Sequence, residues 1–283
     1  MRIIRRKKGN KHYFYLQYSI RKGKKVLTNE TYLGKNIPKN IEEIKQRLDK
    51  EIKKDIYKKL EKIKLNFQKE WQKLPDVIKE KEIDEIAIAF TYNTNAIEGS
   101  TITLPDTINI IKNKIAPNKP LLDIKETEFH YKLFLDILNK KEKITNELLL
   151  KWHKEIFGET KNEIAGKYRN YLVRVGSYIA PDWQDVKHLI NSLIAFMNEA
   201  KINPVELTAR SHYKFEIIHP FGDGNGRIGR LLMNYILWHN RYPMIIIEKK
   251  KRLAYYRALQ RGEDVFLNYF FKLYIKIHKK FIK

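Results

Sequence analysis

The densest group of chemically informative residues in this chain is the stretch His219-Pro-Phe-Gly-Asp-Gly-Asn-Gly-Arg-Ile-Gly-Arg230. Gly222, Gly224 and Gly226 free the backbone for positive φ angles and let successive N–H groups point into one concavity. An apolar stripe at helical spacing follows over residues 226–239 and predicts an amphipathic helix. A glycine-rich loop that leads into a helix N-terminus is an anion site, because free amides and the helix dipole both favour negative charge.

The charged residues of the same stretch point to phosphate chemistry. Arg227 and Arg230 lie three apart, so both guanidinium groups can reach one anion, and two such forks suit a polyphosphate better than a carboxylate. Asp223 offers a hard oxygen ligand for Mg²⁺ shared with phosphates. His219 is the group whose ordinary pKa, about 6.5, suits a general base near neutrality. Each feature alone is more often structural, but their conjunction indicates phosphoryl or nucleotidyl transfer.

The stretch resembles, without gaps, the Fic motif His-Pro-Phe-x-(Asp/Glu)-Gly-Asn-Gly-Arg-x-x-Arg. The resemblance extends to Ala209–Ile218, which is similar to the helix before the motif, and to Gly166–Gly176, which is similar to the family's flap hairpin. Arg252–Leu259 is similar to the helix that lines the nucleotide base. The similarity covers about residues 80–275, so the resemblance predicts a mainly α-helical Fic-type bundle with a short β-hairpin flap.

The resemblance implies a protein adenylyltransferase that uses ATP and Mg²⁺ to transfer AMP to a Ser, Thr or Tyr hydroxyl of a target protein. His219 would take the proton from the target hydroxyl, and Asp223 would hold Mg²⁺ at the α- and β-phosphates. Arg227 and Arg230 would hold the β- and γ-phosphates. The remaining implied site residues are the anion hole (Gly224, Asn225, Gly226) and the flap that docks the target as an added strand (Leu172, Val173, Val175). Tyr255 and Tyr256 are candidates either for contact with the base or for aromatic packing.

A second motif, Thr94-Asn-Ala-Ile-Glu98-Gly99, concerns regulation. A glutamate in the last turn of a helix faces the negative end of the dipole. It is therefore either an exposed, slightly unfavourable residue or the partner of an arginine in the anion site. The motif resembles the Fic inhibitory motif (Ser/Thr)-x-x-x-Glu-(Gly/Asn) at the N-terminal position of the family's class II. That resemblance implies that Glu98 pairs with Arg230 and keeps the γ-phosphate from its productive position.

The chain has 283 residues, a formal net charge of +24 and no cysteine, which excludes disulfides and thiolate chemistry. No apolar run approaches the ~20 residues of a membrane span, and the basic start lacks the apolar segment of a signal peptide. We therefore expect a cytoplasmic protein without a membrane partner.

The charge is concentrated at the N-terminus, where residues 1–40 contain twelve basic side chains and one acid, Glu30. Residues 12–20 and 26–33 have the aromatic and β-branched content of strands, with a turn around Gly23. Aromatic residues interleaved with cations on a small sheet are one form of nucleic-acid surface. The alternative is a solvated hairpin that packs on the body of the protein. The segment also has a weak resemblance, over about thirty residues, to short N-terminal modules of some transposases.

Helical periodicity dominates the rest of the chain. We predict a long amphipathic helix from Ile41 to about Leu74, ended by Pro75. The predicted division is a basic β-rich module at 1–40, a helical connector at 41–80 and a Fic domain at 81–283. Further helices are predicted at about 81–97, 105–114, 123–139, 145–157, 183–199, 204–218, 226–239 and 250–282, with a hairpin at Gly166–Gly176.

Several functional questions stay open at the level of sequence. Glu98 could instead orient a water that hydrolyses AMP–protein, and another nucleotidyl transfer on the same site is a further alternative. The basic module at 1–40 could carry the main activity by binding nucleic acid. A homodimer is also predicted as a candidate assembly, and Tyr171, Tyr178 and Thr94 are candidate self-modification sites. The target protein cannot be identified from the sequence.

Overall fold

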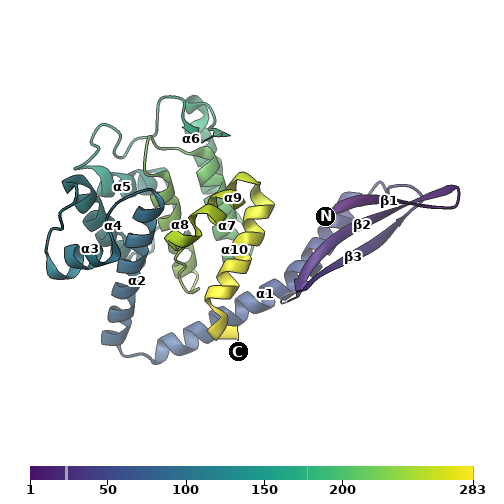
Figure 1. Ribbon diagram of the computed structural model, residues 1–283, viewed down its shortest axis with the longest axis horizontal. Coiled ribbons are helices and arrows are strands. Elements are labelled where there is room, and N and C mark those ends of the chain that lie inside the picture. The colour runs from purple at the N-terminus through teal and green to yellow at the C-terminus, as the bar shows by residue number, and fades with distance from the viewer. Residues whose placement is uncertain (23–24, 177, 283) are drawn as a thin grey trace. The chain divides into compact units, whose positions relative to one another are not determined.

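The computed structural model describes residues 1–22, 25–176 and 178–282 (Figure 1). The chain divides into two compact units, Met1–Lys59 and Leu60–Lys283. Their boundary lies inside helix α1 (Ile41–Lys73), so this one helix contributes to both. The division of the sequence at residues 40 and 80 stays a prediction.

The first unit contains an antiparallel sheet with the order β1-β2-β3. Its strands are β1 (Arg2–Lys8), β2 (Lys11–Lys22) and β3 (Lys25–Gly34). Strand β1 was missed in the sequence because five of its seven residues are basic, yet Ile3 pairs with the fully buried Leu16 of β2. The predicted turn at Gly23 lies outside the described residues.

The second unit is mainly helical, which confirms the predicted fold class. Its helices are α2 (Asp76–Ile97), α3 (Leu104–Ile108), the π-helical turn η1 (Asn109–Asn113), α4 (Leu121–Asn139), α5 (Asn146–Phe157), η2 (Trp183–Asp185), α6 (Val186–Glu199), α7 (Pro204–Ile218), α8 (Asn225–His239), η3 (Lys249–Lys251), α9 (Arg252–Gln260), α10 (Glu263–Ile277) and η4 (Lys279–Ile282). No helix among the described residues is long and apolar enough to cross a membrane.

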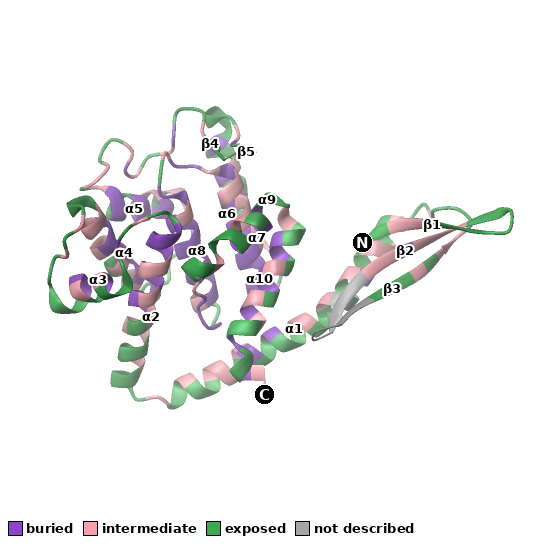
Figure 2. Ribbon diagram, in the orientation of Figure 1, coloured by how far each residue is buried: buried purple, intermediate pink, exposed green. Residues whose placement is uncertain are grey.

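Helix α8 forms the centre of this unit. It contacts α2, α4, α5 and α7, and its residues from Ile228 to Leu237 are buried, as Figure 2 shows. Burial on every face explains why this helix is rigidly placed, since burying one large aliphatic side chain contributes about 1.5–3 kcal/mol. The N-terminus of α8 is therefore a fixed point for the residues around it.

Two predicted elements differ from the structure. The helix predicted at 250–282 is interrupted after Gln260, because Gly262 adopts φ 103° and starts a new helix, α10. The hairpin predicted at Gly166–Gly176 lies further along the chain, as β4 (Arg174–Val175) paired with β5 (Tyr178–Ile179). Residues 167–172 are not in a strand, because Arg169 is held by contacts to other segments, described below.

Candidate active site

The loop between α7 and α8 places its residues by two left-handed backbone conformations. His219 ends α7 with φ 50° and ψ 60°, and its N–H donates to the Phe215 carbonyl over 2.9 Å. Gly224 starts α8 with φ 79°, and a Cβ added there would overlap the Phe157 ring. Since glycine has no side-chain cap to offer, the first N–H groups of α8 remain directed at the loop, as an anion site requires.

The side-chain amide of Asn225 closes the loop by hydrogen bonding to the backbone of Phe221. Asn225 Oδ1 accepts from the Phe221 N–H and Asn225 Nδ2 donates to the Phe221 carbonyl, both over 2.8 Å. The side chain of Asn225 is therefore a structural brace, and its predicted place in the anion hole, which its backbone N–H could still fill, stays a prediction. Phe221 is fully buried beneath the loop, as its apolar ring predicts.

His153 supports the loop from below. Its ring stacks on Phe221 at a centroid distance of 3.9 Å. The Gly166 N–H donates to Nδ1 over 2.9 Å, so Nε2 carries the proton and donates to the Asp223 carbonyl over 3.0 Å. Burial lowers the pKa of His153 to about 4, which keeps the ring neutral and the tautomer fixed near pH 7.

Arg169 ties the flap segment to the catalytic loop. Its Nε donates to the His219 carbonyl over 2.8 Å, and its Nη1 and Nη2 donate to the carbonyls of Tyr171 and Pro181 over 2.8 Å and 2.6 Å. Burial lowers the pKa of His219, and the positive charge of Arg169 acts in the same direction. The imidazole is therefore neutral at pH 7, the form that a general base needs.

Arg230 is the most enclosed cation of the site, with 1% of its surface exposed. Its Nε donates to Thr94 Oγ1 over 2.6 Å, and its Nη2 donates to the Thr94 carbonyl over 3.1 Å and to Glu98 Oε1 over 2.6 Å. Burial opposes the charge, but the Glu98 carboxylate raises the pKa of Arg230 above its ordinary value. Thr94 and Glu98 of the Thr94–Gly99 motif thus both contact Arg230, the second arginine of the His219–Arg230 stretch.

The Glu98 carboxylate lies at the first turn of α8. A Cβ added at Gly226 would overlap Glu98 Oε1, so glycine is needed at this position for the close approach. Arg230 Nη1 is buried and lacks a hydrogen-bond partner among the described residues. One donor of the guanidinium is therefore free beside the carboxylate, where a phosphate oxygen could accept from it.

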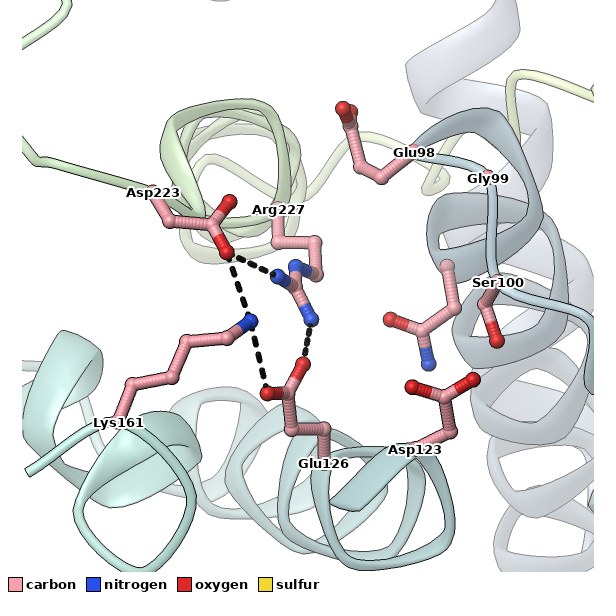
Figure 3. A pocket seen from close by; sticks show the side chains of 9 residues that line it. Glu98, Gly99, Ser100, Asp123, Glu126, Lys161, Asp223 and Arg227 are labelled. Atoms are coloured by element: carbon pink, nitrogen blue, oxygen red, sulfur yellow. Dashed lines mark hydrogen bonds and ion pairs between the residues drawn. The ribbon is translucent and has the colours of Figure 1, made fainter. Parts of the chain in front are cut away.

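Arg227 belongs to a second charge network, drawn in Figure 3. Its Nη1 contacts Glu126 Oε2, and its Nη2 lies 3.6 Å from Asp223 Oδ2. Lys161 Nζ bridges the same two acids, 2.9 Å from Glu126 Oε1 and 2.7 Å from Asp223 Oδ2. These residues line a pocket of about 270 Å³, together with Asn95, Glu98, Gly99, Ser100 and Asp123. Arg227 therefore lines the pocket while its guanidinium is paired with the buried Glu126 carboxylate.

Asp223 fits a magnesium ligand of the kind that shares its metal with phosphates. Its side chain is about half exposed, and burial is outweighed by Lys161 and Arg227, which lower the pKa of the carboxyl and keep it ionised. No group of three or more acidic or histidine side chains suited to hold a metal occurs among the described residues. A single carboxylate plus substrate oxygens is a usual environment for Mg²⁺.

The flap hairpin presents apolar side chains to solvent. Leu172 and Val175 are 64% and 39% exposed, and Ile179 is 58% exposed. Val173 accepts at its carbonyl from the Ala180 N–H over 3.0 Å, which extends the short ladder. Of the three predicted docking residues, Val175 lies in β4, and Leu172 and Val173 lie directly before that strand.

The structure favours aromatic packing for one tyrosine and excludes one candidate self-modification site. Tyr255 is fully buried and its hydroxyl is bonded to His212 over 2.6 Å, so it packs in the core and does not face a nucleotide base. Tyr256 is partly exposed, with its hydroxyl 3.4 Å from both oxygens of Glu98. Thr94 is 1% exposed and bonded to Arg230, so it is no surface site for self-modification.

Glu216 is a buried carboxyl behind Arg230. Its Oε1 lies 3.8 Å from His212 Nε2, would be 2.9 Å from a Cβ at Gly229, and has no hydrogen-bond partner within the described chain. Burial raises the pKa of Glu216 to about 8, against the charge of Arg230 and with that of Glu98. The protonated form is therefore the native one near pH 7.

This raised pKa predicts a stability that depends on pH. The protonated Glu216 stabilises the fold fully below the ordinary pKa of 4.5, and this stabilisation is lost as the pH rises toward 8. We expect the free energy of unfolding to fall by about 1 kcal/mol per pH unit between pH ~6.5, above which buried histidines no longer titrate, and the folded pKa of Glu216 of about 8, and Glu216→Gln to flatten this slope. Urea unfolding at three pH values measures it; equal slopes in both proteins would rule out this role.

Sequence reasoning missed Glu126, Lys161, Arg169 and His153. Glu126 carried a detectable signal, because it lies four residues before His130 and seven before Leu133 on the buried side of α4, where an acid needs a partner. Lys161 and Arg169 lie in loop segments that have no apolar periodicity, so no sequence pattern distinguishes them. His153 lies on the apolar stripe of α5 and reads as an ordinary packed histidine.

The chain is similar to a family profile and to curated proteins that share one family name, Fic. The Fic/DOC family profile matches residues 143–237. Proteins named Protein adenylyltransferase Fic are similar over 64% of this chain: one from Nematostella vectensis is 34% identical and covered over 44% of its length, and one from Aedes aegypti is 33% identical and covered over 38%. The chain thus spans less than half the length of these curated relatives.

Solved structures show the same fold. Fic-1 from C. elegans (residues 134–508) superposes with a TM-score of 0.70 at 25% identity, over 87% of this chain and 77% of that one. A Fic domain containing signaling protein from Bacteroides thetaiotaomicron has the same TM-score at 24% identity, over 80% of this chain and 96% of that one.

Proposed function

We propose that this chain, whose residues 143–237 match the Fic/DOC family profile, is a protein adenylyltransferase restrained by its own Glu98. It would transfer AMP from ATP to a Ser, Thr or Tyr hydroxyl of a target protein. The relatives named as protein adenylyltransferases support the reaction class. The complete His219–Arg230 stretch supports a working site, since no position departs from the active motif.

In the proposed reaction, neutral His219 accepts the proton of the target hydroxyl as its oxygen attacks the α-phosphorus. The N–H groups at the first turn of α8 stabilise the charge that develops on the α-phosphate. Arg227 and Arg230 orient the β- and γ-phosphates so that pyrophosphate leaves in line. Asp223 would hold Mg²⁺, which would supply neutralisation of phosphate charge.

The proposal of restraint is carried by the Glu98–Arg230 ion pair. Glu98 takes one guanidinium donor over 2.6 Å and lies against Gly226, where an incoming phosphate would need both the donor and the space. A carboxylate and a phosphate cannot share that position, because like charges at contact repel strongly in a buried site. Release of Glu98 from Arg230 is therefore the step that activates the enzyme.

The target is proposed to dock on the flap hairpin. The exposed Leu172, Val175 and Ile179 are apolar, and the two-residue strands leave the hairpin open to pairing with an extended segment. Strand addition gives affinity through main-chain hydrogen bonds and leaves the target hydroxyl to be selected by side chains.

Labelling of a native lysate tests the proposed reaction and its donor together. Glu98→Gly protein is incubated with several nucleotides, each labelled at the α-phosphate, and the labelled bands are identified by mass spectrometry. The expected result is transfer from ATP to a hydroxyl of a distinct protein. Label that appears only on free nucleotide products, with no protein band, would point to hydrolysis instead.

A second candidate function has its own observation, in the first unit. Tyr13 and Tyr15 of β2 cluster with Tyr32 of β3, at ring-centroid distances of 6.2 Å and 5.3 Å, and the guanidinium of Arg6 lies 5.6 Å from the Tyr15 ring centroid. These aromatic rings lie on the sheet face opposite to the buried Leu16 side chain, and 56% of the Tyr32 surface is exposed to solvent. Exposed aromatic rings among cations suit single-stranded nucleic acid, by stacking on bases and by phosphate contacts.

The nucleic-acid surface predicts a specific loss in Tyr32→Ala. Removing one stacking ring is expected to weaken binding of a single-stranded oligonucleotide by the full chain about tenfold, with an affinity that falls steeply with salt. Fluorescence anisotropy measures both, and Tyr171→Ala, which removes an exposed tyrosine of the second unit, is the matched control. Absence of binding by the parent chain at about 50 mM salt, or an unchanged affinity in Tyr32→Ala, would refute this function.

A further inference from the structure

Lys161 stands out among the residues that line the pocket. It follows α5 on a loop, and its ammonium bridges Asp223 and Glu126 over 2.7 Å and 2.9 Å. It also lies 5.1 Å from the centroid of the Phe157 ring. About a third of its side chain is exposed, so the ammonium is held in the site by the two acids while it keeps access to solvent.

The contacts of Asp223 show what Lys161 does in this state. Asp223 Oδ1 accepts from the Gly224 N–H over 2.6 Å, and Oδ2 accepts from Lys161. Both oxygens of the proposed metal ligand are therefore engaged, one of them by a cation. A divalent ion that binds Asp223 Oδ2 competes with the ammonium for that oxygen, because Lys161 is in direct contact with it at 2.7 Å while Arg227 lies further away at 3.6 Å, and a third cation there adds repulsion.

The pocket offers the displaced ammonium a new partner. Lys161 and Arg227 are the cationic side chains of its lining, and they lie on one wall with Asp223 and Glu126 (Figure 3). Glu126 stays neutralised without Lys161, because it also contacts Arg227 and accepts from Thr160 Oγ1 over 3.0 Å. A freed ammonium in this pocket would therefore bind the anion that enters it.

We propose that Lys161 is a tethered cation with two positions: it holds Asp223 in the nucleotide-free site, and it binds the terminal phosphates of ATP once a metal ion has taken Asp223. The inference rests on the proposed function for the identity of the nucleotide. It assigns Lys161 to the leaving pyrophosphate, alongside the two arginines of the motif. Lys161 thereby couples metal binding to recognition of the triphosphate.

The first half of the inference is tested with a metal ion alone. Mn²⁺ binding to the nucleotide-free protein, followed by electron paramagnetic resonance, is expected to be severalfold tighter in Lys161→Met than in the parent, because a competing cation has been removed. Lys167→Met is the matched control, since it removes an exposed lysine of the same loop outside the site. Equal Mn²⁺ affinities in the parent and Lys161→Met would overturn the inference.

The second half is tested by comparing ATP with AMP in the Glu98→Gly background. Lys161→Met is expected to lower the affinity for ATP about tenfold, with little change in the affinity for AMP, which lacks the terminal phosphates. Lys161→Arg, which keeps the charge, should recover most of the loss. Equal loss for both nucleotides would indicate a merely structural role and would overturn the inference.

These binding measurements separate the inference from the proposed function. Neither requires transfer of AMP to a protein. If Lys161→Met behaves as expected but no protein is labelled by any nucleotide, the proposed function fails while the role of Lys161 as a phosphate and metal-exchange residue stands. If labelling succeeds while Lys161→Met binds Mn²⁺, ATP and AMP as the parent does, only the inference fails.

Discussion

Replacing His219 with alanine is expected to lower AMP transfer about 1,000-fold, within the range that a positioned general base contributes. The two histidines that pack near the loop and α8, His153 and His212, are already engaged. His153 is committed at both ring nitrogens, and the Nε2 of His212 is bonded to Tyr255. His219 is also the residue that the left-handed end of α7 and the Arg169 contact place at the loop.

Protein labelling by α-labelled ATP, in the Glu98→Gly background, measures this loss. His188→Ala is the matched control, because it removes an exposed histidine of α6. ATP affinity should change little in His219→Ala, since the residue acts on the target hydroxyl. A variant that retains more than about a tenth of the parent's transfer, against the 100-fold or more expected of a general base, would remove His219 from the role of base.

Replacing Glu98 with glycine is expected to raise AMP transfer by about tenfold to 100-fold. A hydrogen bond to a charged group contributes about 1.5–3 kcal/mol, and this one must be broken before Arg230 can bind phosphate. Glu98→Gln keeps the size of the side chain but not its charge, so it should give an intermediate rise. Initial rates of labelling at a fixed ATP concentration measure the series.

The same substitution carries a cost in stability. Without Glu98, the buried guanidinium of Arg230 keeps only its two contacts to Thr94. We expect the free energy of unfolding to fall by about 2 kcal/mol and Mg-ATP to restore more stability in Glu98→Gly than in the parent, because ligand binding stabilises the state it selects. If Glu98→Gly transferred AMP no faster than the parent, the inhibitory assignment would be wrong.

The sequence predicted the part of the site whose residues lie close together along the chain. The His219–Arg230 stretch lies within one loop and one helix turn, so its geometry follows from glycine positions and helical period. The Glu98–Arg230 contact could be predicted from the sequence because Glu98 and Arg230 each belong to a recognisable motif.

What the sequence left out depends on tertiary contact. Glu126 neutralises Arg227 from 101 positions away, and Arg169 holds the His219 carbonyl from a loop without periodicity. The helical class was predictable from the apolar period, but the break at Gly262 was not, since one glycine in a helical pattern is often tolerated. The sequence left base contact and aromatic packing open for Tyr255, and packing with His212 and Phe266 decides its position.

The central claim is that the site transfers the nucleotidyl group and that Glu98 restrains it. The most direct measurement incubates the Glu98→Gly protein and a native lysate with Mg²⁺ and ATP labelled at either the α- or the γ-phosphate. Relative to the same lysate without added protein, Glu98→Gly is expected to add the α label to protein and to add no γ label, and the parent chain to add a weaker α signal. Added γ label above the lysate alone, or equal added α label from parent and Glu98→Gly, would contradict the claim.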